Sequence, residues 1–284
     1  MVFEAKTTSV DGLTISYWEG GQGNGRTLLL VHGGLGDASQ HWGPIAPLLT
    51  EEFHILAPDL PGFGGSQALP VKRTDVLMRW LRGFLDNLGL DQAVVVGNSL
   101  GGLIARLFAA NNPQLVPAVI LVNGGAVPDF PPLMRILERV PGVSHLLFTQ
   151  VTRASLTPAS LRAMLYVEDI LTDAFLRGVR AAAPGFSGLL RMIVASPPQQ
   201  QQTPLVPTLI LWGANDQVAT LAGAEVIKDS IPGAILTEIA DCGHMPQLET
   251  PDVFAWQVSN FLQKLSRPQR DDLPGAGMLP PYPG

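Results

Sequence analysis

The chain has 284 residues, 46% of them hydrophobic, which suits one large globular domain or one domain that carries an insertion. Its 18 basic and 24 acidic residues give a net charge of -6 without a cluster of Lys or Arg that would neutralise several phosphates, which argues against nucleic acid as a partner. No apolar run reaches the ~18 residues of a membrane span and residues 1–6 lack a basic or apolar leader, so we expect a cytoplasmic protein.

The first third of the chain predicts strands and one helix. Residues 14–18 alternate in polarity and a glycine-rich turn leads into residues 27–32, a pattern that predicts an opening β-hairpin. The runs at 28–31 and 53–59 are apolar on both faces, as in strands buried in a parallel sheet. Apolar positions between 74 and 88 share one helical face, and Gly89 is a natural stop.

Small residues follow the strand at 28–31, in the sequence His32-Gly33-Gly34. Such residues at a strand end allow a backbone N–H to point into a crevice, and Gly34 is the best candidate for an oxyanion donor there. The His32 ring is expected to brace the loop by hydrogen bonds. The loop that follows Asp59 contains Pro61 and several glycines, and Asp59 is expected to brace that turn.

Ser99 is the candidate nucleophile. It follows a β-branched run, lies between Gly97 and Gly101, and precedes a helical pattern. A strand that reverses at once into a helix holds its central residue in a sparsely populated conformation, and only small neighbours let the two arms approach so closely. The hydroxyl is then raised clear of the sheet, and the N–H of Leu100 at the helix start is a second candidate oxyanion donor.

After a further strand at 118–124, the alternation of strands and helices breaks from about residue 125 to 203. Short amphipathic helices are expected there, among them 132–140, 158–167 and 172–182. Such an insertion behind the carboxyl edge of a strand lies over the place where open α/β sheets bind ligands. We therefore expect residues 1–124 and 204–266 to form the core and residues 125–203 a helical cap, with 199–202 as a polar linker.

The last part of the chain returns to buried strands. Residues 207–213 deliver Asp216, and residues 234–239 lead to a loop that contains His244. Cys242 is the only cysteine, so an internal disulfide and a thiolate metal cage are excluded; its position two residues from His244 disfavours a catalytic Cys-His pair. A helix is expected over 251–265, followed by a Pro/Gly-rich tail at 267–284 that we expect to be disordered or laid on the surface.

Three strand ends thus supply Ser99, Asp216 and His244, in this order. With the motifs around them, the chain from about Thr14 to Leu265 resembles the α/β-hydrolase superfamily. The motifs that carry the resemblance are His32-Gly33-Gly34, the loop Asp59 to Ser66, the turn Gly97 to Gly101, Trp212 to Asp216, and Gly243 to Pro246. The implied fold class is α/β: a mostly parallel, doubly wound sheet with an inserted helical cap.

The resemblance implies a serine hydrolase without cofactor or metal. His244 would take the proton of Ser99 as the hydroxyl attacks a carbonyl carbon, Asp216 would orient the imidazole, and the N–H groups of Gly34 and Leu100 would receive the oxyanion. Serine at position 99 departs from the haloalkane dehalogenase and epoxide hydrolase branches, which the chain otherwise resembles in its cap. The expected substrate is a small-molecule carboxylic ester with an apolar acyl or aromatic group.

Two alternatives stay open. The turn at 97–102 also resembles that of meta-cleavage-product hydrolases, which cut carbon–carbon bonds and usually carry Trp where this chain has Met245. Some superfamily members are ligand receptors with little turnover. The possible substrate contacts predicted from the cap pattern and the neighbouring motifs are Trp42, Tyr166, Arg177, Arg180 and Met245, with Arg177 or Arg180 as the group that would hold a substrate carboxylate.

Overall fold

The computed structural model describes residues 3–128, 130–140, 142–196 and 203–266. An eight-stranded sheet runs through them in the order β1-β2-β4-β3-β5-β6-β7-β8. Its strands are β1 (Glu4–Val10), β2 (Leu13–Gly20), β3 (Thr27–Val31), β4 (His54–Pro58), β5 (Val94–Asn98), β6 (Val119–Val122), β7 (Thr208–Gly213) and β8 (Ile235–Ile239). All pairs from β4 onward are parallel. The predicted α/β fold class is confirmed.

The predicted opening hairpin between residues 14–18 and 27–32 is wrong, because these two strands are not neighbours in the sheet. β2 pairs antiparallel with β1 on one side and with β4 on the other, so β4 separates β2 from β3. The hairpin is instead β1–β2, closed by Asp11 and Gly12, both with positive φ. Asp-Gly with this backbone matches the tight turns that suit the twist of paired strands. The glycine-rich segment before β3 is a longer connection across the sheet.

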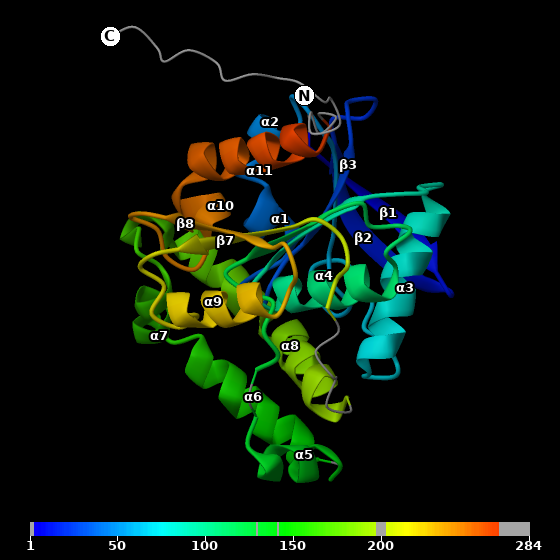
Figure 1. Cartoon of the computed structure of the whole chain (residues 1–284). Coiled ribbons are helices and arrows are strands. Elements are labelled where there is room, and N and C mark those ends of the chain that lie inside the picture. Colours follow the sequence, from blue (N-terminus) through cyan, green and yellow to red (C-terminus); the bar gives the residue numbers. More distant parts are fainter. Residues whose placement is uncertain (1–2, 129, 141, 197–202, 267–284) are drawn as a thin grey trace, which may run out of the picture.

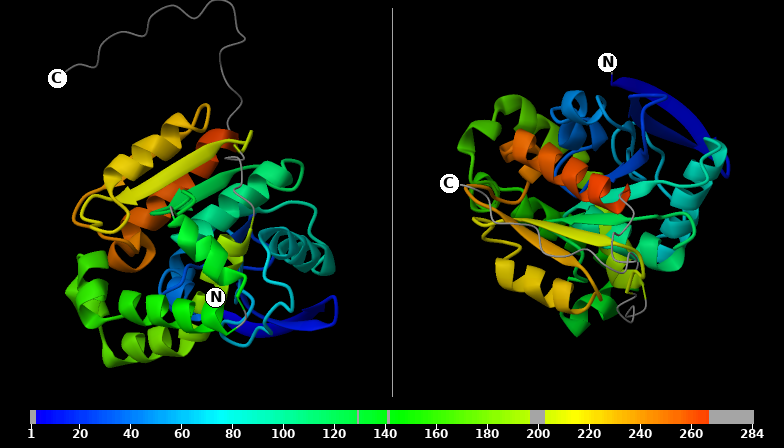
Figure 2. Two further views of the ribbon diagram at one scale, coloured as in Figure 1. Left: turned by 90° about the horizontal axis from the view of Figure 1, so that it is seen from below. Right: turned by 45° about the horizontal axis from the view of Figure 1, so that its top comes forward.

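Helices cover both faces of the sheet (Figures 1 and 2). One face carries α3 (Thr74–Asn87), α4 (Leu100–Asn111) and α9 (Leu221–Asp229), and the other carries α1 (Ala38–Trp42), α2 (Ala46–Leu49) and α11 (Pro251–Ser266). Alternate residues of β3 divide between the two faces: Leu29 and Val31 pack on the first, Leu28 and Leu30 on the second. Strands buried on both faces read as continuous apolar runs, which explains the pattern seen in the sequence.

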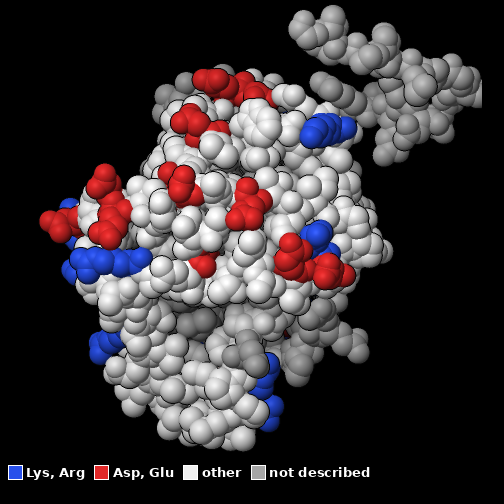
Figure 3. Space-filling model, turned by 60° about the vertical axis from the view of Figure 1, so that its left-hand side comes forward, with Lys and Arg blue, Asp and Glu red and all other residues white. Residues whose placement is uncertain are grey.

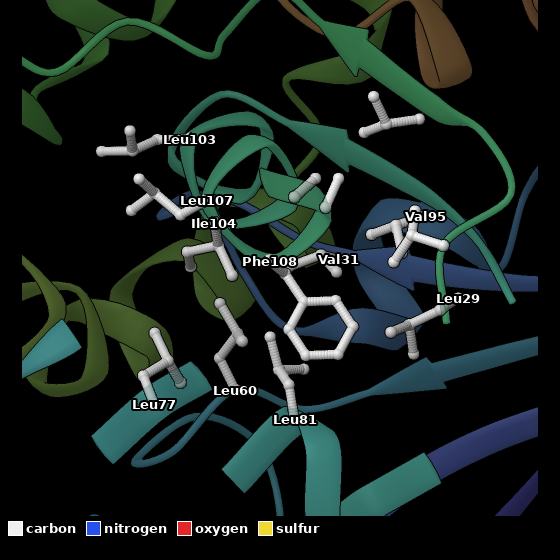
Figure 4. Packing of buried hydrophobic residues seen from close by; sticks show 14 of the residues in the cluster. Leu29, Val31, Leu60, Leu77, Leu81, Val95, Leu103, Ile104, Leu107 and Phe108 are labelled. Atoms are coloured by element: carbon white, nitrogen blue, oxygen red, sulfur yellow. The ribbon is translucent and has the colours of Figure 1, made fainter. Parts of the chain in front are cut away.

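The first of these two layers is centred on α4. Phe108, Ile104 and Leu107 of α4 lie against Leu81 and Leu77 of α3 and against the sheet (Figure 4). Almost every residue of α4 is buried, in agreement with its mainly apolar sequence. The helix that begins at the candidate nucleophile is therefore held on all sides by packing.

The cap lies at one edge of this core, below the sheet in Figure 1. Its elements are α5 (Pro132–Glu138), α6 (Val143–Ser155), α7 (Pro158–Met164), a 3-10 turn η1 (Glu168–Ile170) and α8 (Asp173–Ala195). Two N-caps that the sequence indicates are present: Thr157 accepts the N–H of Ser160, and Thr172 accepts that of Phe175. The division of cap from core at residues 125 and 203 stays a prediction.

α8 is longer than the sequence predicts. It continues past Ala182, through Pro184 and Gly185, to Ala195. Proline removes one helical hydrogen bond and glycine weakens a helix, but Leu189, Met192 and Ile193 are buried in the same cluster as α3 and α4. Tertiary packing of the second half outweighs the local signals.

Two predicted segments, the linker at 199–202 and the tail at 267–284, lie outside the described residues. Within the described ranges, the helices are all too short or too polar to cross a membrane.

Candidate active site

Ser99 occupies the turn between β5 and α4 with φ 58° and ψ -122°. This left-handed value is uncommon for a residue with a side chain and is retained only where the surroundings impose it. The Ser99 N–H donates to the Val122 carbonyl at 2.9 Å, and its own carbonyl accepts the Gly102 N–H at 2.9 Å. The main chain on both sides of the hydroxyl is thus held by hydrogen bonds.

Glycines make this turn possible by close approach. A Cβ atom at position 97 would overlap the Gly101 carbonyl, and one at position 101 would overlap the Val31 carbonyl. A Cβ at position 124 would overlap the Ser99 carbonyl, and one at position 33 would lie 2.9 Å from the Ser99 Cβ. The two glycines predicted to make room are confirmed, and Gly33 and Gly124 do the same from neighbouring strands.

Replacing Gly97 by alanine should therefore destabilise the protein strongly. Because the overlap is with main chain that cannot rotate away, we expect a cost of about 3 kcal/mol or more, at the upper end of overpacking. Thermal unfolding measures it, as a fall in Tm of roughly 6–12 °C. Gly223→Ala in α9 is the matched control: a Cβ there meets no atom within 4 Å, so helix propensity should leave Tm unchanged or raise it. Equal losses in both variants would contradict the close-packing explanation.

His244 and Asp216 are brought together from two loops. His244 lies between β8 and α10 (Pro246–Glu249), and Asp216 follows β7. The Nδ1 of His244 lies 2.6 Å from Oδ2 of Asp216, and both side chains are buried. The geometry makes Nδ1–H the donor, so Nε2 is the nitrogen that remains free to act as a base.

The Asp216 carboxylate is held in its charged form. Burial alone would raise its pKa, but the hydrogen bond and the favourable electrostatic interaction with His244 and the hydrogen bonds from Ala219 and Asn123 outweigh burial and hold the pKa below the ordinary range of aspartic acid. Its Oδ1 accepts the N–H groups of Val218 and Ala219, each at 2.9 Å. Since the folded-state pKa is depressed, the stabilisation from this carboxylate is present at neutral pH and is lost only as the pH falls through that lowered value.

Two asparagines that the sequence analysis missed connect these groups. Asn123, after β6, donates from Nδ2 to Oδ2 of Asp216 at 2.7 Å, and its Oδ1 accepts the Gly213 N–H at 3.0 Å. Asn98, directly before Ser99, donates to the carbonyl of His244 at 3.0 Å. The turn of Ser99 is thereby tied to the loop of His244. Asn98 is the last residue of β5 and Asn123 directly follows β6. This position at the end of a buried strand is the sequence signal that could have identified the two asparagines.

The loop after β3 is braced by two histidines. His32 donates from Nδ1 to the Gly33 carbonyl at 2.7 Å and accepts the Leu60 N–H at 2.9 Å, as predicted for a bracing ring. His41, which the sequence analysis did not select, accepts the Gly33 N–H on Nε2 at 3.2 Å. Burial lowers the pKa of both rings. The nearby His32 and His244 lower the pKa of His41 further. Both histidines are therefore neutral.

Asp59 braces its loop as predicted. Its Oδ2 accepts the Gly65 N–H and its Oδ1 accepts the Ala38 N–H, both at 3.0 Å. The carboxylate joins the loop after β4 to the start of α1. It makes no contact with His244 among the described interactions, whereas Asp216 is hydrogen-bonded to that imidazole.

The cap covers Gly34 with an aromatic ring. A Cβ at position 34 would meet three ring atoms of Phe186 at 2.5–2.8 Å. Within the described part of the chain, the Gly34 N–H makes no hydrogen bond. Leu100 is the first residue of α4, where an N–H has no acceptor inside the helix. Phe186 packs with Leu100 and Phe130 in one apolar cluster, so the space beside Ser99 is bounded by hydrocarbon.

Two of the predicted substrate contacts are corrected. Trp42 is fully buried between the sheet and α11, with its ring 6.4 Å from that of Phe254, because α1 turns this side chain into the core. Tyr166 is about half exposed, and its hydroxyl donates to the Asp241 carboxylate at 3.3 Å at the surface. Neither side chain is directed at the triad.

The prediction that Arg177 or Arg180 holds a substrate carboxylate is also corrected. Arg177 is exposed on the side of α8 opposite to buried Phe175 and Val179. Arg180 is exposed and lines a cavity to which no triad residue contributes. Met245 is fully buried among cap residues such as Leu161 and Phe175, so its contact with substrate stays a prediction.

Glu249 ties the cap to the histidine loop. Its Oε2 accepts the N–H groups of Tyr166, Val167 and Gly243 at 2.7–3.1 Å, and its Oε1 accepts that of Met245 at 2.9 Å. The His244 N–H donates to the carbonyl of Met164 at 2.8 Å. The end of α7 and the catalytic loop are thus one hydrogen-bonded unit.

Other chemistry is disfavoured by this arrangement. Burial raises the pKa of the Cys242 thiol to about 12, so it is not a thiolate at neutral pH. Among the described residues, His, Cys, Asp and Glu side chains do not gather in groups of three that could hold a metal ion.

Residues 26–177 and 165–251 match the family model described as alpha/beta hydrolase fold. The chain belongs to the α/β hydrolase fold family. It is a hydrolase with the mostly parallel sheet of that family.

Similar proteins include several hydrolases. A 2-hydroxy-6-oxononadienedioate/2-hydroxy-6-oxononatrienedioate hydrolase of Klebsiella pneumoniae is 30% identical over 93% of this chain and 100% of its own length. A meta-cleavage product hydrolase of Pseudomonas fluorescens has a TM-score of 0.70 and 25% identity, covering 92% of this chain and 98% of that one. A bacterial membrane phospholipase A has a TM-score of 0.74 and 27% identity, covering 94% and 87%.

Proposed function

We propose that this hydrolase cleaves carboxylic esters of apolar acyl or aromatic groups through an acyl-enzyme on Ser99. The observation that carries the proposal is the 2.6 Å hydrogen bond between His244 and Asp216, together with a serine held at positive φ whose preceding residue, Asn98, donates to the His244 carbonyl. The bond leaves Nε2 of His244 as the base, and the backbone strain at Ser99 presents the hydroxyl at the end of the sheet.

In the first half-reaction, Oγ of Ser99 attacks the ester carbonyl carbon while its proton passes to Nε2 of His244. The N–H groups of Gly34 and Leu100 donate to the oxyanion. The intermediate collapses as the C–O bond to the alcohol breaks, and the alcohol leaves with the proton from His244. Water then gives a proton to His244 and attacks the acyl group, which releases the acid and returns the proton to Ser99.

The apolar surroundings of Ser99 support an uncharged substrate. Phe186 lies over Gly34, and Leu100 and Phe130 belong to the same cluster. The cap arginines that would hold a carboxylate are exposed instead. Burying a phenyl ring or a medium alkyl chain against such side chains contributes roughly 1.5–3 kcal/mol.

A series of p-nitrophenyl esters from acetate to decanoate tests the preference. We expect kcat/KM to rise by about ten- to a hundredfold from acetate to the medium chains, as expected for a hydrophobic pocket. Phe186→Ala should flatten the rise, whereas Leu133→Ala, an exposed cap residue, should not. A flat wild-type series would contradict the selection by apolar contacts, and ester binding without turnover would favour a receptor.

Carbon–carbon bond hydrolysis is the second candidate. It is favoured by the 30% identity to the Klebsiella pneumoniae hydrolase over 93% of this chain and 100% of that protein's length. A meta-cleavage dienoate should be assayed beside the ester series. Cleavage of the dienoate with a higher kcat/KM than any ester would replace the esterase proposal by this one.

A further inference from the structure

A cavity of about 720 Å³ lies against α8, and Ser99, Asp216 and His244 do not line it. It is lined by α6, by α8 and by the segment of the core that precedes α3, and it opens to the surface. Its volume is in the range of cavities that bind small molecules. We call it the basic cavity, because five of its lining residues are Lys72, His145, Arg153, Arg180 and Arg191.

The α8 helix itself separates the basic cavity from the active site. Arg180, Pro184 and Arg191 recur on one face of α8 and line the cavity. Phe186 points from a different face onto Gly34. A ligand in the basic cavity would therefore contact the cap and the core without touching Ser99.

The positive charges of the basic cavity are poorly balanced. None of the described lining residues is Asp or Glu, and the nearest ion-paired acid, Glu138, lies 3.9 Å from Arg191. By contrast, Arg73, Arg79 and Arg82 meet carboxylates of α3 at 2.8–3.2 Å. On the face shown in Figure 3, acidic side chains gather over the core, in the upper part of the view, while the cap below carries basic ones.

Buried donors without partners lie in the same wall. Thr152 is 1% exposed and lines the basic cavity, and its hydroxyl makes no hydrogen bond among the described residues. The Nε of Arg191 is also buried and has no acceptor in the described structure. Buried polar groups are normally hydrogen-bonded, and a ligand with several oxygens in this cavity would bring acceptors close to these two donors.

We propose that the basic cavity binds a compact polyanion that carries several phosphate or carboxylate oxygens. Planar guanidinium groups suit such oxygens because they donate two parallel hydrogen bonds to them. A bound anion would also relieve the repulsion among the cations. Burial and the neighbouring Arg191 lower the pKa of Lys72 although Glu138 acts in the opposite direction, and a bound anion would favour the charged form of Lys72.

Isothermal titration calorimetry at constant ionic strength tests this proposal, with pyrophosphate and citrate as separate probes. We expect saturable one-to-one binding of at least one of them, and the one that binds more tightly identifies phosphate or carboxylate as the source. Lys72→Gln and Arg180→Gln should each raise Kd about tenfold or more, because each removes a charged hydrogen bond. Neither side chain has an ion pair among the described residues, so both variants should fold.

Arg177→Gln is the matched control, since Arg177 is exposed on α8 about one turn before Arg180 and does not line the cavity. It should bind as the wild type does. Absence of saturable binding by both anions, or equal weakening in all three variants, would overturn the proposal. The readout is independent of turnover, so its failure is distinguishable from failure of the ester proposal.

Discussion

Replacement of Ser99 by alanine should reduce kcat for every ester by at least about 10³, because only binding and the oxyanion donors then remain. In the proposed mechanism, the Ser99 hydroxyl is the group that forms the covalent bond to the acyl group. Ser99 is also closely approached by Gly33 and Gly124, at which a Cβ atom would overlap its Cβ and its carbonyl. Alanine keeps the Cβ and tolerates the same close packing, so the loss should appear in kcat while Tm stays near that of the wild type.

A serine-reactive phosphonate measures the same assignment directly. Mass spectrometry should find its mass on the peptide that contains Ser99 and nowhere in Ser99→Ala. Ser66→Ala is the control, because Ser66 also follows a glycine, but its hydroxyl accepts the Ser16 N–H at 3.0 Å. That variant should lose about 1–3 kcal/mol of stability and keep its kcat. Label on Ser66 instead of Ser99 would show that the nucleophile is misassigned.

Asp216→Asn should lower kcat by about 10⁴, as expected when an imidazole is held in the wrong tautomer. The reason is that Oδ1 of Asp216, the oxygen that does not contact His244, accepts hydrogen bonds of its own. Two backbone N–H groups, of Val218 and Ala219, require an acceptor at the Oδ1 position. The amide oxygen of asparagine would take that position, and its NH₂ group would face Nδ1 of His244. The imidazole then carries its proton on Nε2 and no longer accepts one from Ser99.

Asp241→Asn is the matched control for this variant. Asp241 is only three residues from His244, but its carboxylate meets the Tyr166 hydroxyl at the surface. Its φ of 52° is one that asparagine also adopts readily. Steady-state kinetics should therefore give near wild-type turnover. Full activity in Asp216→Asn together with loss in Asp241→Asn would mean that the orienting carboxylate had been misassigned.

Sequence predicts the framework of the site well, since strand ends are visible as buried apolar runs. The parallel sheet collects those ends at one edge, and Asp216 and His244 do meet there. Side-chain direction is less visible. The resemblance to meta-cleavage-product hydrolases suggested Trp42 as a substrate contact, but a tryptophan at this position also suits the core, and only its packing against Phe254 decides between the two roles.

Local signals fail where tertiary packing opposes them. Pro184 and Gly185 indicate a helix end, yet the buried residues after them continue α8 to Ala195. The order of strands is similarly hidden, because nothing local in β2 indicates that β4 rather than β3 is its neighbour. Asn123 shows a third limit: its role depends on a 2.7 Å contact with a residue 93 positions away.

The packing of α8 also determines which parts of the cap could be deleted from the chain. β6 and β7 are parallel neighbours, with Val122 opposite Leu211, so the chain must return along the whole length of the strand between them. Parallel strands need such a crossover, and α8 contributes Leu189, Met192 and Ile193 to the core as it makes the return. Excision of the whole insertion would remove the crossover connection together with the other cap helices. A minimal, open version of this hydrolase would delete α5 to α7 and rejoin the chain ahead of Asp173.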